Sequence, residues 1–120
     1  MPRNYTCQGW TANELYDLFN TRYFRGRLPK IPVRWVAPHA RERSVIGCTR
    51  FRLEEDGVER PYEICIHPRI KNEGAIWVLT LLHEQVHVEQ YKVPREQAHG
   101  RKFEKRMKQL AQQGAFRGLW

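Results

Sequence analysis

Residues 79–87 read LTLLHEQVH, and this stretch decides the fold of the chain. It closes a strongly apolar segment that begins at Ala75 and whose side chains cover most faces of a helix. Such a helix must be buried, so we expect a central helix over about residues 73–91 that ends before Pro94. Its last turns carry two histidines and a glutamate, and polar groups at a buried site are costly unless they have a partner.

The histidines of this stretch, His83 and His87, are four residues apart, so on a helix they lie on one face, one turn apart. Two imidazoles placed in this way can bind one zinc ion at about 2.0–2.1 Å. Glu84 lies close to such an ion without having to bind it, which is where a general base must lie to accept a proton from metal-activated water. The alternative is an exposed or hydrogen-bonded histidine pair, which the apolar surroundings disfavour.

A catalytic zinc ion usually has three protein ligands and one open position. His99 is the best-placed third ligand, because residues 88–98 allow one chain reversal that returns the next helix to the metal. His67, at the end of a predicted strand, is the alternative third ligand. Three other residues could bind a metal ion but are expected on the surface: His39, Glu89 and Glu96.

Two further helices are predicted from apolar spacing and capping residues. Thr11 and Glu14 have the spacing of a capping box, which starts a helix over about residues 12–24. A last helix is expected over about residues 100–113, with Gly114 as its C-terminal stop.

Three strands are expected between the first helix and the central one, at residues 31–36, 44–53 and 62–67. Gly47 marks a bulge or a point of close approach in the second strand. The Asp-Gly pair at 56–57 predicts a hairpin between the second and third strands. Because the strands precede the last two helices, we expect one α+β domain with a mostly antiparallel sheet over the whole chain, residues 1–120.

The composition fits one cytoplasmic domain. The chain has 120 residues, of which 41% are hydrophobic, enough for a core without disulfide bonds. Cys7, Cys48 and Cys65 are odd in number and form no CxxC pair, which argues against a disulfide framework and a cysteine zinc site. The N-terminus shows no signal-peptide pattern, and the longest apolar run, residues 75–82, is too short to span a membrane.

Lysine and arginine number 21 against 13 acidic residues, giving a net charge of +8. A positive surface attracts nucleic acid, anionic membranes or acidic proteins. A second hypothesis is therefore a nucleic-acid-binding module with a structural zinc ion, and an ordinary solvated helix face is the alternative. The candidate contacts on the last helix are Arg101, Lys102, Lys105, Arg106 and Lys108, and those near the second strand are Arg41, Arg43, Arg50 and Arg52.

Several of these segments together resemble the SprT-like family of zinc metallopeptidases, which includes the Spartan-type proteases of DNA–protein crosslinks. Residues 79–87 resemble the metal-binding helix of that family. Ala98-His99-Gly100 and Phe103 resemble its His-Gly-x-x-Phe element, which provides the third ligand. Further similarity covers the opening helix and two strands, at residues 15–20, 28–29, 46–48 and 64–68.

The resemblance implies a zincin domain that hydrolyses peptide bonds, with zinc on His83, His87 and His99 and with Glu84 as general base. It also implies DNA-bound or DNA-crosslinked proteins as substrates. His67 stands where the family often has asparagine. No cysteine-rich zinc ribbon follows the catalytic region, so the similarity is to the minimal catalytic domain.

The sequence leaves some features of the chemistry open. The motif predicts an activated water but not the bond that it attacks, so a zinc amidase acting on a non-protein substrate stays an alternative. The candidates for a donor to the oxyanion are Tyr91, Arg95 and His67. An extended peptide is expected to add to an edge strand, for which we favour residues 44–53.

Overall fold

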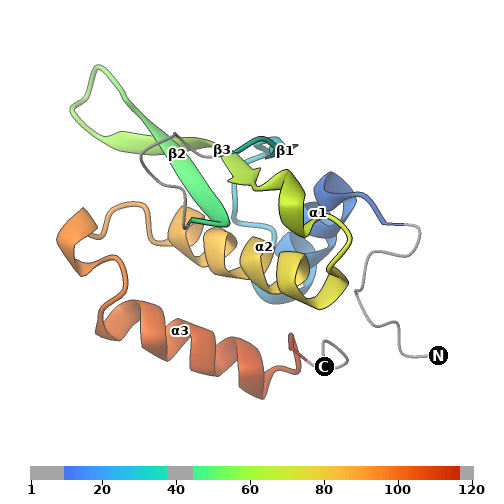
Figure 1. Ribbon diagram of the computed structural model, residues 1–120. Helices are drawn as coiled ribbons and strands as arrows, with labels where there is room; N and C mark the ends of the chain where they lie inside the picture. Colours follow the sequence, from blue (N-terminus) through green and yellow to red (C-terminus); the bar gives the residue numbers. More distant parts are fainter. Residues whose placement is uncertain (1–9, 38–44, 117–120) are drawn as a thin grey trace.

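The computed structural model describes residues 10–37 and 45–116 of the chain. The sheet covers one side of helix α2, α3 lies on the opposite side and α1 flanks it (Figure 1). The elements in chain order are α1 (Ala12–Tyr23), β1 (Val33–Trp35), β2 (Gly47–Leu53), β3 (Glu59–Ile66), the short 3-10 helix η2 (Pro68–Ile70), α2 (Gly74–Glu89), the 3-10 helix η3 (Arg95–Gln97) and α3 (Arg101–Gln112).

Helix α2 is buried in the middle of the molecule, as its sequence predicts. The side chains of Trp77, Val78, Leu81, Leu82 and Val86 are all at most 1% exposed, because the sheet, α1 and α3 surround the helix. The helix is slightly shorter at both ends than the predicted span of residues 73–91. No helix within the described parts of the chain has the length and hydropathy of a membrane span.

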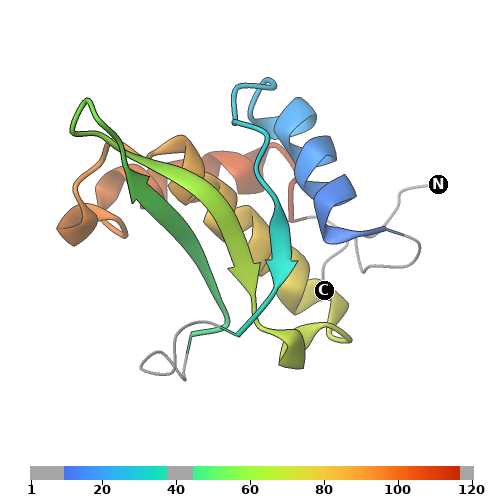
Figure 2. The ribbon, with the colours of Figure 1, turned by 90° about the horizontal axis from the view of Figure 1, so that it is seen from above.

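The sheet has the strand order β1-β3-β2, so β3 is central and β2 forms one edge (Figure 2). β1 pairs with β3 in parallel, with Val33 opposite Ile64, and β2 pairs with β3 antiparallel, with Cys48 opposite Cys65. The chain reverses before and after β2, and β1 and β3 therefore run in the same direction. The predicted α+β class is confirmed, with a mixed sheet in which the longer pair is antiparallel.

The predicted hairpin joins β2 and β3, but β3 begins at Glu59 instead of residue 62. Its turn is held by Arg60, which forms ion pairs with Glu54 at 2.8 Å and with Asp56 at 2.8 Å. Gly57 adopts a positive φ of 82°, a conformation that glycine takes at low cost. These contacts order the end of the hairpin and extend the strand beyond the apolar residues that predicted it.

Gly47 allows β2 to pack directly on α2. A Cβ atom at this position would lie 2.5 Å from Cγ2 of Thr80, closer than two carbon atoms can approach. The predicted close approach is therefore confirmed, whereas the predicted bulge lies elsewhere, between Arg50 and Phe51. Ser44, where the second strand was expected to begin, is outside the described residues.

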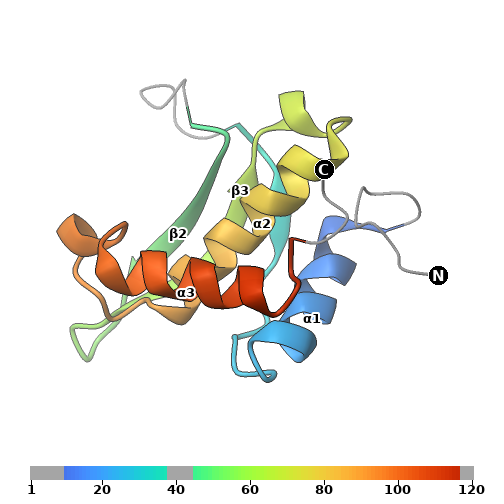
Figure 3. The ribbon, with the colours of Figure 1, turned by 90° about the horizontal axis from the view of Figure 1, so that it is seen from below.

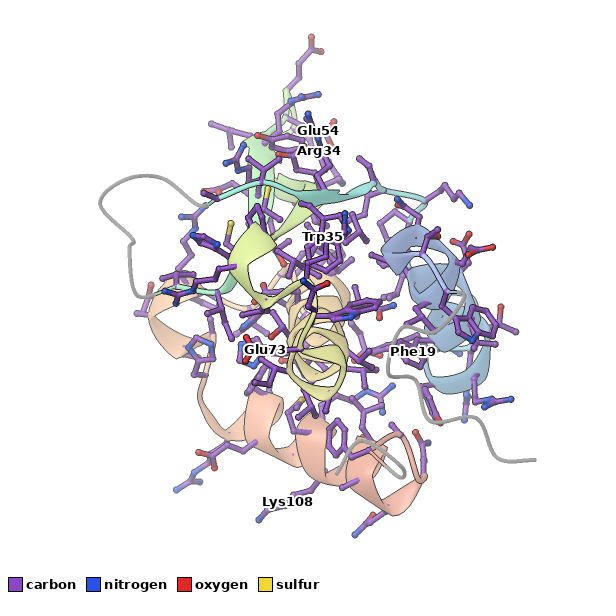
Figure 4. All side chains as sticks on the ribbon, turned by 45° about the vertical axis from the view of Figure 1, so that its right-hand side comes forward. Phe19, Arg34, Trp35, Glu54, Glu73 and Lys108 are labelled. Atoms are coloured by element: carbon purple, nitrogen blue, oxygen red, sulfur yellow. The ribbon has the colours of Figure 1, made fainter. Side chains whose placement is uncertain are left out.

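The outer face of the sheet carries a charged network that ties its three strands together. Glu63 of β3 is only 6% exposed and pairs with Arg50 of β2 at 3.0 Å and with Arg34 of β1 at 3.4 Å. Arg34 lies on the side of the sheet away from the helices, whereas Trp35 points towards α2 and packs edge-on against Trp77 (Figure 4). Neighbouring side chains of β1 thus face solvent and core in turn.

Helix α3 crosses α2 on the face opposite the sheet (Figure 3). It runs within one residue of the span predicted at each end. Phe103 and Leu110 face the core, and Lys108 points away from the rest of the molecule (Figure 4). After the helix, Ala115 is fully buried, so the chain continues on the core beyond the helix end.

Helix α1 begins at the predicted capping box, in which Thr11 and Glu14 hydrogen-bond to each other's backbone N–H. Asn20 fixes the segment after the helix, because its side chain accepts from the N–H of Leu28 at 3.0 Å and donates to the carbonyl of Leu28 at 3.1 Å. Asn13 makes the same pair of contacts with Val33 of β1. Asn20 thus attaches the helix to the segment that follows it, and Asn13 attaches it to β1.

Asn20→Ala removes both hydrogen bonds to Leu28 and leaves two partly buried backbone groups without these partners. We expect the free energy of unfolding to fall by about 1–3 kcal/mol. Urea denaturation followed by circular dichroism measures this change. Lys30→Ala, which breaks only an exposed ion pair with Asp17, is the control and should have a much smaller effect. Equal stability of the two variants would contradict this account of the docking of α1.

Candidate metal centre

Three imidazoles meet at the end of α2. His83 and His87 lie one turn apart on the helix, with their Nε2 atoms 3.1 Å apart. Nε2 of His99 lies 3.0 Å from that of His87 and 3.3 Å from that of His83. The reversal between α2 and α3 passes through η3 and places His99 beside Gly100, the N-cap of α3. The structure thus brings together the three histidines that the sequence nominates.

The donor atoms of this cluster fit a single metal ion. Three nitrogens bound to one zinc ion in tetrahedral geometry lie about 3.3 Å apart, close to the distances between these Nε2 atoms. Hydrogen bonds within the cluster cannot satisfy all three contacts, because each Nε2 of a neutral ring either donates or accepts and at least two of the three are therefore of the same kind. Among the described residues, this is the one group of histidine, cysteine or acidic side chains whose geometry could hold a metal ion.

The environment keeps the helical histidines neutral. Burial, together with His99, lowers the pKa of His83 to about 4. Burial and then the two neighbouring imidazoles lower the pKa of His87 to about 4. Imidazoles with such values are neutral near pH 7 and keep the lone pair that a metal ion requires.

Phe103 supports all three imidazoles from α3. Its ring centroid lies 4.8 Å from that of His83, 4.8 Å from that of His87 and 5.1 Å from that of His99. Its side chain is only 8% exposed, so it closes the cluster on the side of α3. The periodicity of the last helix identifies Phe103 only as a core residue. Its spacing from His99 is the one feature of the sequence that associates it with the histidines.

Glu84 is held next to the cluster by a strand. The residue is 5% exposed, and the hydroxyl of Thr49 on β2 donates to its Oε1 at 2.8 Å. Its other oxygen, Oε2, lies 3.9 Å from Nε2 of His83. Burial raises the pKa of Glu84 to about 7, and the hydrogen bond from Thr49 opposes this shift. No motif around Thr49 indicated this contact, which depends on the close packing of β2 on α2.

A cleft of about 700 Å³ opens beside the cluster, between β2 and α2. Gly47 and Thr49 line it from the strand, Leu79 and Glu84 line it from the helix, and His99 lies at its edge. β2 is an edge strand, as expected for the segment that would receive an extended peptide. The cleft therefore offers a path along a strand edge to the three imidazoles.

The alternative ligands that the structure describes lie elsewhere. His67 caps η2, where its Nδ1 accepts from the N–H of Arg69 at 3.1 Å. Glu89 forms an ion pair with Arg106 at 2.7 Å. Glu96 is exposed in η3, and His39 is outside the described residues. The structure therefore groups His99, and not the alternatives described here, with the helical pair.

Of the candidate oxyanion donors, only Arg95 lines the cleft with the histidines. Tyr91 lines an adjoining pocket, where the ammonium of Lys92 lies over its ring at 5.8 Å from the centroid. His67 lines neither the cleft nor this pocket, and its side chain caps η2.

The candidate nucleic-acid contacts on α3 fall into two groups. The exposed ones are Arg101, Lys102, Lys105 and Lys108. Arg106, by contrast, turns inward and donates both to Glu89 and to the carbonyl of Tyr23.

The arginines of β2 also have partners. Arg50 pairs with Glu63, and the guanidinium of Arg52 lies over the ring of Tyr62. Arg41 and Arg43 are outside the described residues. Among the candidate nucleic-acid contacts that the structure describes, the exposed ones are therefore Arg52 on β2 and Arg101, Lys102, Lys105 and Lys108 on α3.

No curated protein and no solved structure gave a match to this sequence. A family model does match it, described as the SprT-like family, and the match covers residues 12–118. This span runs from the first turn of α1 to beyond α3, and it includes the three histidines, Glu84 and Thr49. Because most of the chain matches, the protein belongs to the SprT-like family.

Proposed function

We propose that this protein is a zinc-dependent metallopeptidase that hydrolyses peptide bonds. The observation that carries the proposal is the convergence of three imidazole nitrogens, 3.0–3.3 Å apart, next to a buried glutamate. The cleft beside them runs along an edge strand, which suits an extended polypeptide. Membership of the SprT-like family supports the same activity.

In this proposal His83, His87 and His99 hold the ion, and Phe103 fixes their rings. A bound zinc ion lowers the pKa of water to about 7 and polarises a carbonyl group. Glu84 accepts the proton of the attacking water and passes it to the leaving amine. Thr49 keeps the carboxylate in position through the hydrogen bond to Oε1.

The substrate would bind as an additional strand. Within the part of the chain that the structure describes, β2 pairs on only one side, with β3, so its other edge offers backbone donors and acceptors next to the cleft. A peptide bound along this edge passes the histidines in extended conformation, with side chains alternating between the cleft and solvent. A folded protein has few accessible extended segments, so flexible or unfolded chains are the expected substrates.

His99→Ala should lower zinc occupancy sharply, because the variant keeps only two imidazoles of the proposed site. Metal analysis of protein purified without chelator measures the zinc content per chain. His67→Ala is the matched control and should bind zinc like the unmodified protein, since His67 only caps η2. Full occupancy in the His99 variant, with loss in the His67 variant, would show that the third ligand is assigned wrongly.

Glu84→Gln should retain zinc and the fold but lose roughly 10²–10⁴-fold in the rate of peptide hydrolysis, which is the usual contribution of a general base. A fluorogenic peptide assay with zinc-loaded protein measures the rate. A variant with zinc content and hydrolysis equal to those of the unmodified protein would exclude Glu84 as the base.

We further propose that α3 brings the peptidase to nucleic acid. The exposed cations Arg101, Lys102 and Lys105 lie two, three and six residues after His99, so a phosphate backbone bound there lies near the proposed site. This feature supports DNA-bound proteins as substrates. Phosphate contacts release counterions, so such binding must weaken steeply as salt increases.

Replacing Arg101, Lys102 and Lys105 together with glutamine should weaken DNA binding. The slope of log K against log salt should become shallower by about 0.9 for each phosphate that the variant no longer neutralises. Fluorescence anisotropy at several salt concentrations measures both quantities. The control removes three exposed cations outside α3, those of Arg27, Arg69 and Lys71. If both triple variants lose affinity equally, only net charge matters and α3 is not a specific binding surface.

A further inference from the structure

The pocket that Tyr91 lines has a volume of about 460 Å³ and adjoins the metal centre. It lies between the end of the β2–β3 hairpin and the connection from α2 to His99, which Figure 2 shows next to each other. This pocket and the cleft meet beside His87. Four residues line both of them, and they are Phe51, His87, Arg95 and Ala98. A substrate residue close to the reacting bond can therefore reach the pocket.

The walls of this pocket are mainly apolar. Phe51 and Val58 contribute from the hairpin, and Tyr91, Val93 and Ala98 contribute from the connection after α2. All five residues are half-buried, so their apolar atoms are partly accessible from the pocket. Its volume is within the range of pockets that bind small ligands, large enough for one large side chain. Filling it with an apolar group removes apolar surface of both partners from water.

The charged residues at the rim disfavour a basic side chain. Arg95 donates to Glu59 at 2.9 Å and its guanidinium lies 5.6 Å from the ring centroid of Phe51. Glu59 is the one acidic residue among the described lining residues, and Arg95 already neutralises it. Lys92 adds a second cation. A lysine or arginine of the substrate would meet positive charge without an unpaired carboxylate.

The Arg95–Glu59 pair also connects the two walls. Glu59 belongs to β3 and Arg95 to η3, so the ion pair bridges the hairpin and the segment that leads to His99. Both side chains are largely exposed, and the pair therefore adds little to stability. Both residues line the pocket, so the pair places its charges beside any side chain that enters it.

We propose that this pocket selects substrates with a large apolar residue, such as leucine or phenylalanine, next to the cleaved bond. The inference rests on the peptidase activity proposed above and adds a preference that the activity alone does not require. Phe51, Val58, Tyr91 and Val93 bind the side chain, while Arg95 and Lys92 exclude a basic one.

Zinc-loaded protein is incubated with a peptide library of randomised sequence, and the cleaved bonds are mapped by mass spectrometry. One position beside the bond should be enriched in leucine and phenylalanine. In matched single peptides, kcat/KM should be at least about tenfold higher with leucine at that position than with alanine or lysine, the discrimination typical of an apolar pocket. Cleavage without preference at either neighbouring position overturns the pocket while the peptidase stands. If no peptide is cleaved, the peptidase proposal fails and the pocket proposal fails with it.

Val58→Trp fills the pocket from the hairpin, and Val93→Trp fills it from the opposite wall. Each should reduce the ratio of kcat/KM for the leucine peptide to that for the alanine peptide at least severalfold. Two walls are used so that the second variant still tests the pocket if the first does not fold, which zinc content and circular dichroism report. Ile76→Trp is the control, since Ile76 is exposed on α2 outside both the cleft and the pocket, and it should keep the preference. An unchanged ratio in a folded pocket variant contradicts the proposal.

Discussion

The meeting of three imidazole nitrogens, 3.0–3.3 Å apart, is the constraint on which the rest of the structure depends. Two of them are fixed by one turn of a helix that the sheet, α1 and α3 surround. The third arrives only because the chain reverses through η3 and α3 then packs Phe103 against all three rings. Such a cluster of imidazole nitrogens is favourable when a cation binds their lone pairs.

The same helix connects the metal centre to the sheet. β2 lies directly on α2 because Gly47 has no side chain to hold it away from Thr80. This contact brings the hydroxyl of Thr49 to Glu84 and sets the cleft along a strand edge. The core, the proposed base and the proposed substrate path thus depend on one close approach, so a small displacement of β2 would affect all of them.

Features that repeat locally along the chain were predictable from the sequence. Helical spacing indicated the central helix and placed His83 and His87 on one face, and the capping box marked the start of α1. Contacts between distant segments were not predictable in this way. The parallel pairing of β1 with β3, the hydrogen bond from Thr49 and the pocket beside His87 each join residues whose relative position is set only by the assembled core.

X-ray absorption at the zinc edge of the purified, unmodified protein is the decisive test of the three-histidine site, because it reports the ligands of a bound ion. We expect one zinc ion per chain, with three imidazole nitrogens at about 2.0–2.1 Å and no sulfur ligand. Protein that stays folded but takes up no zinc, or a spectrum dominated by sulfur at about 2.3 Å, would contradict the assignment of His83, His87 and His99.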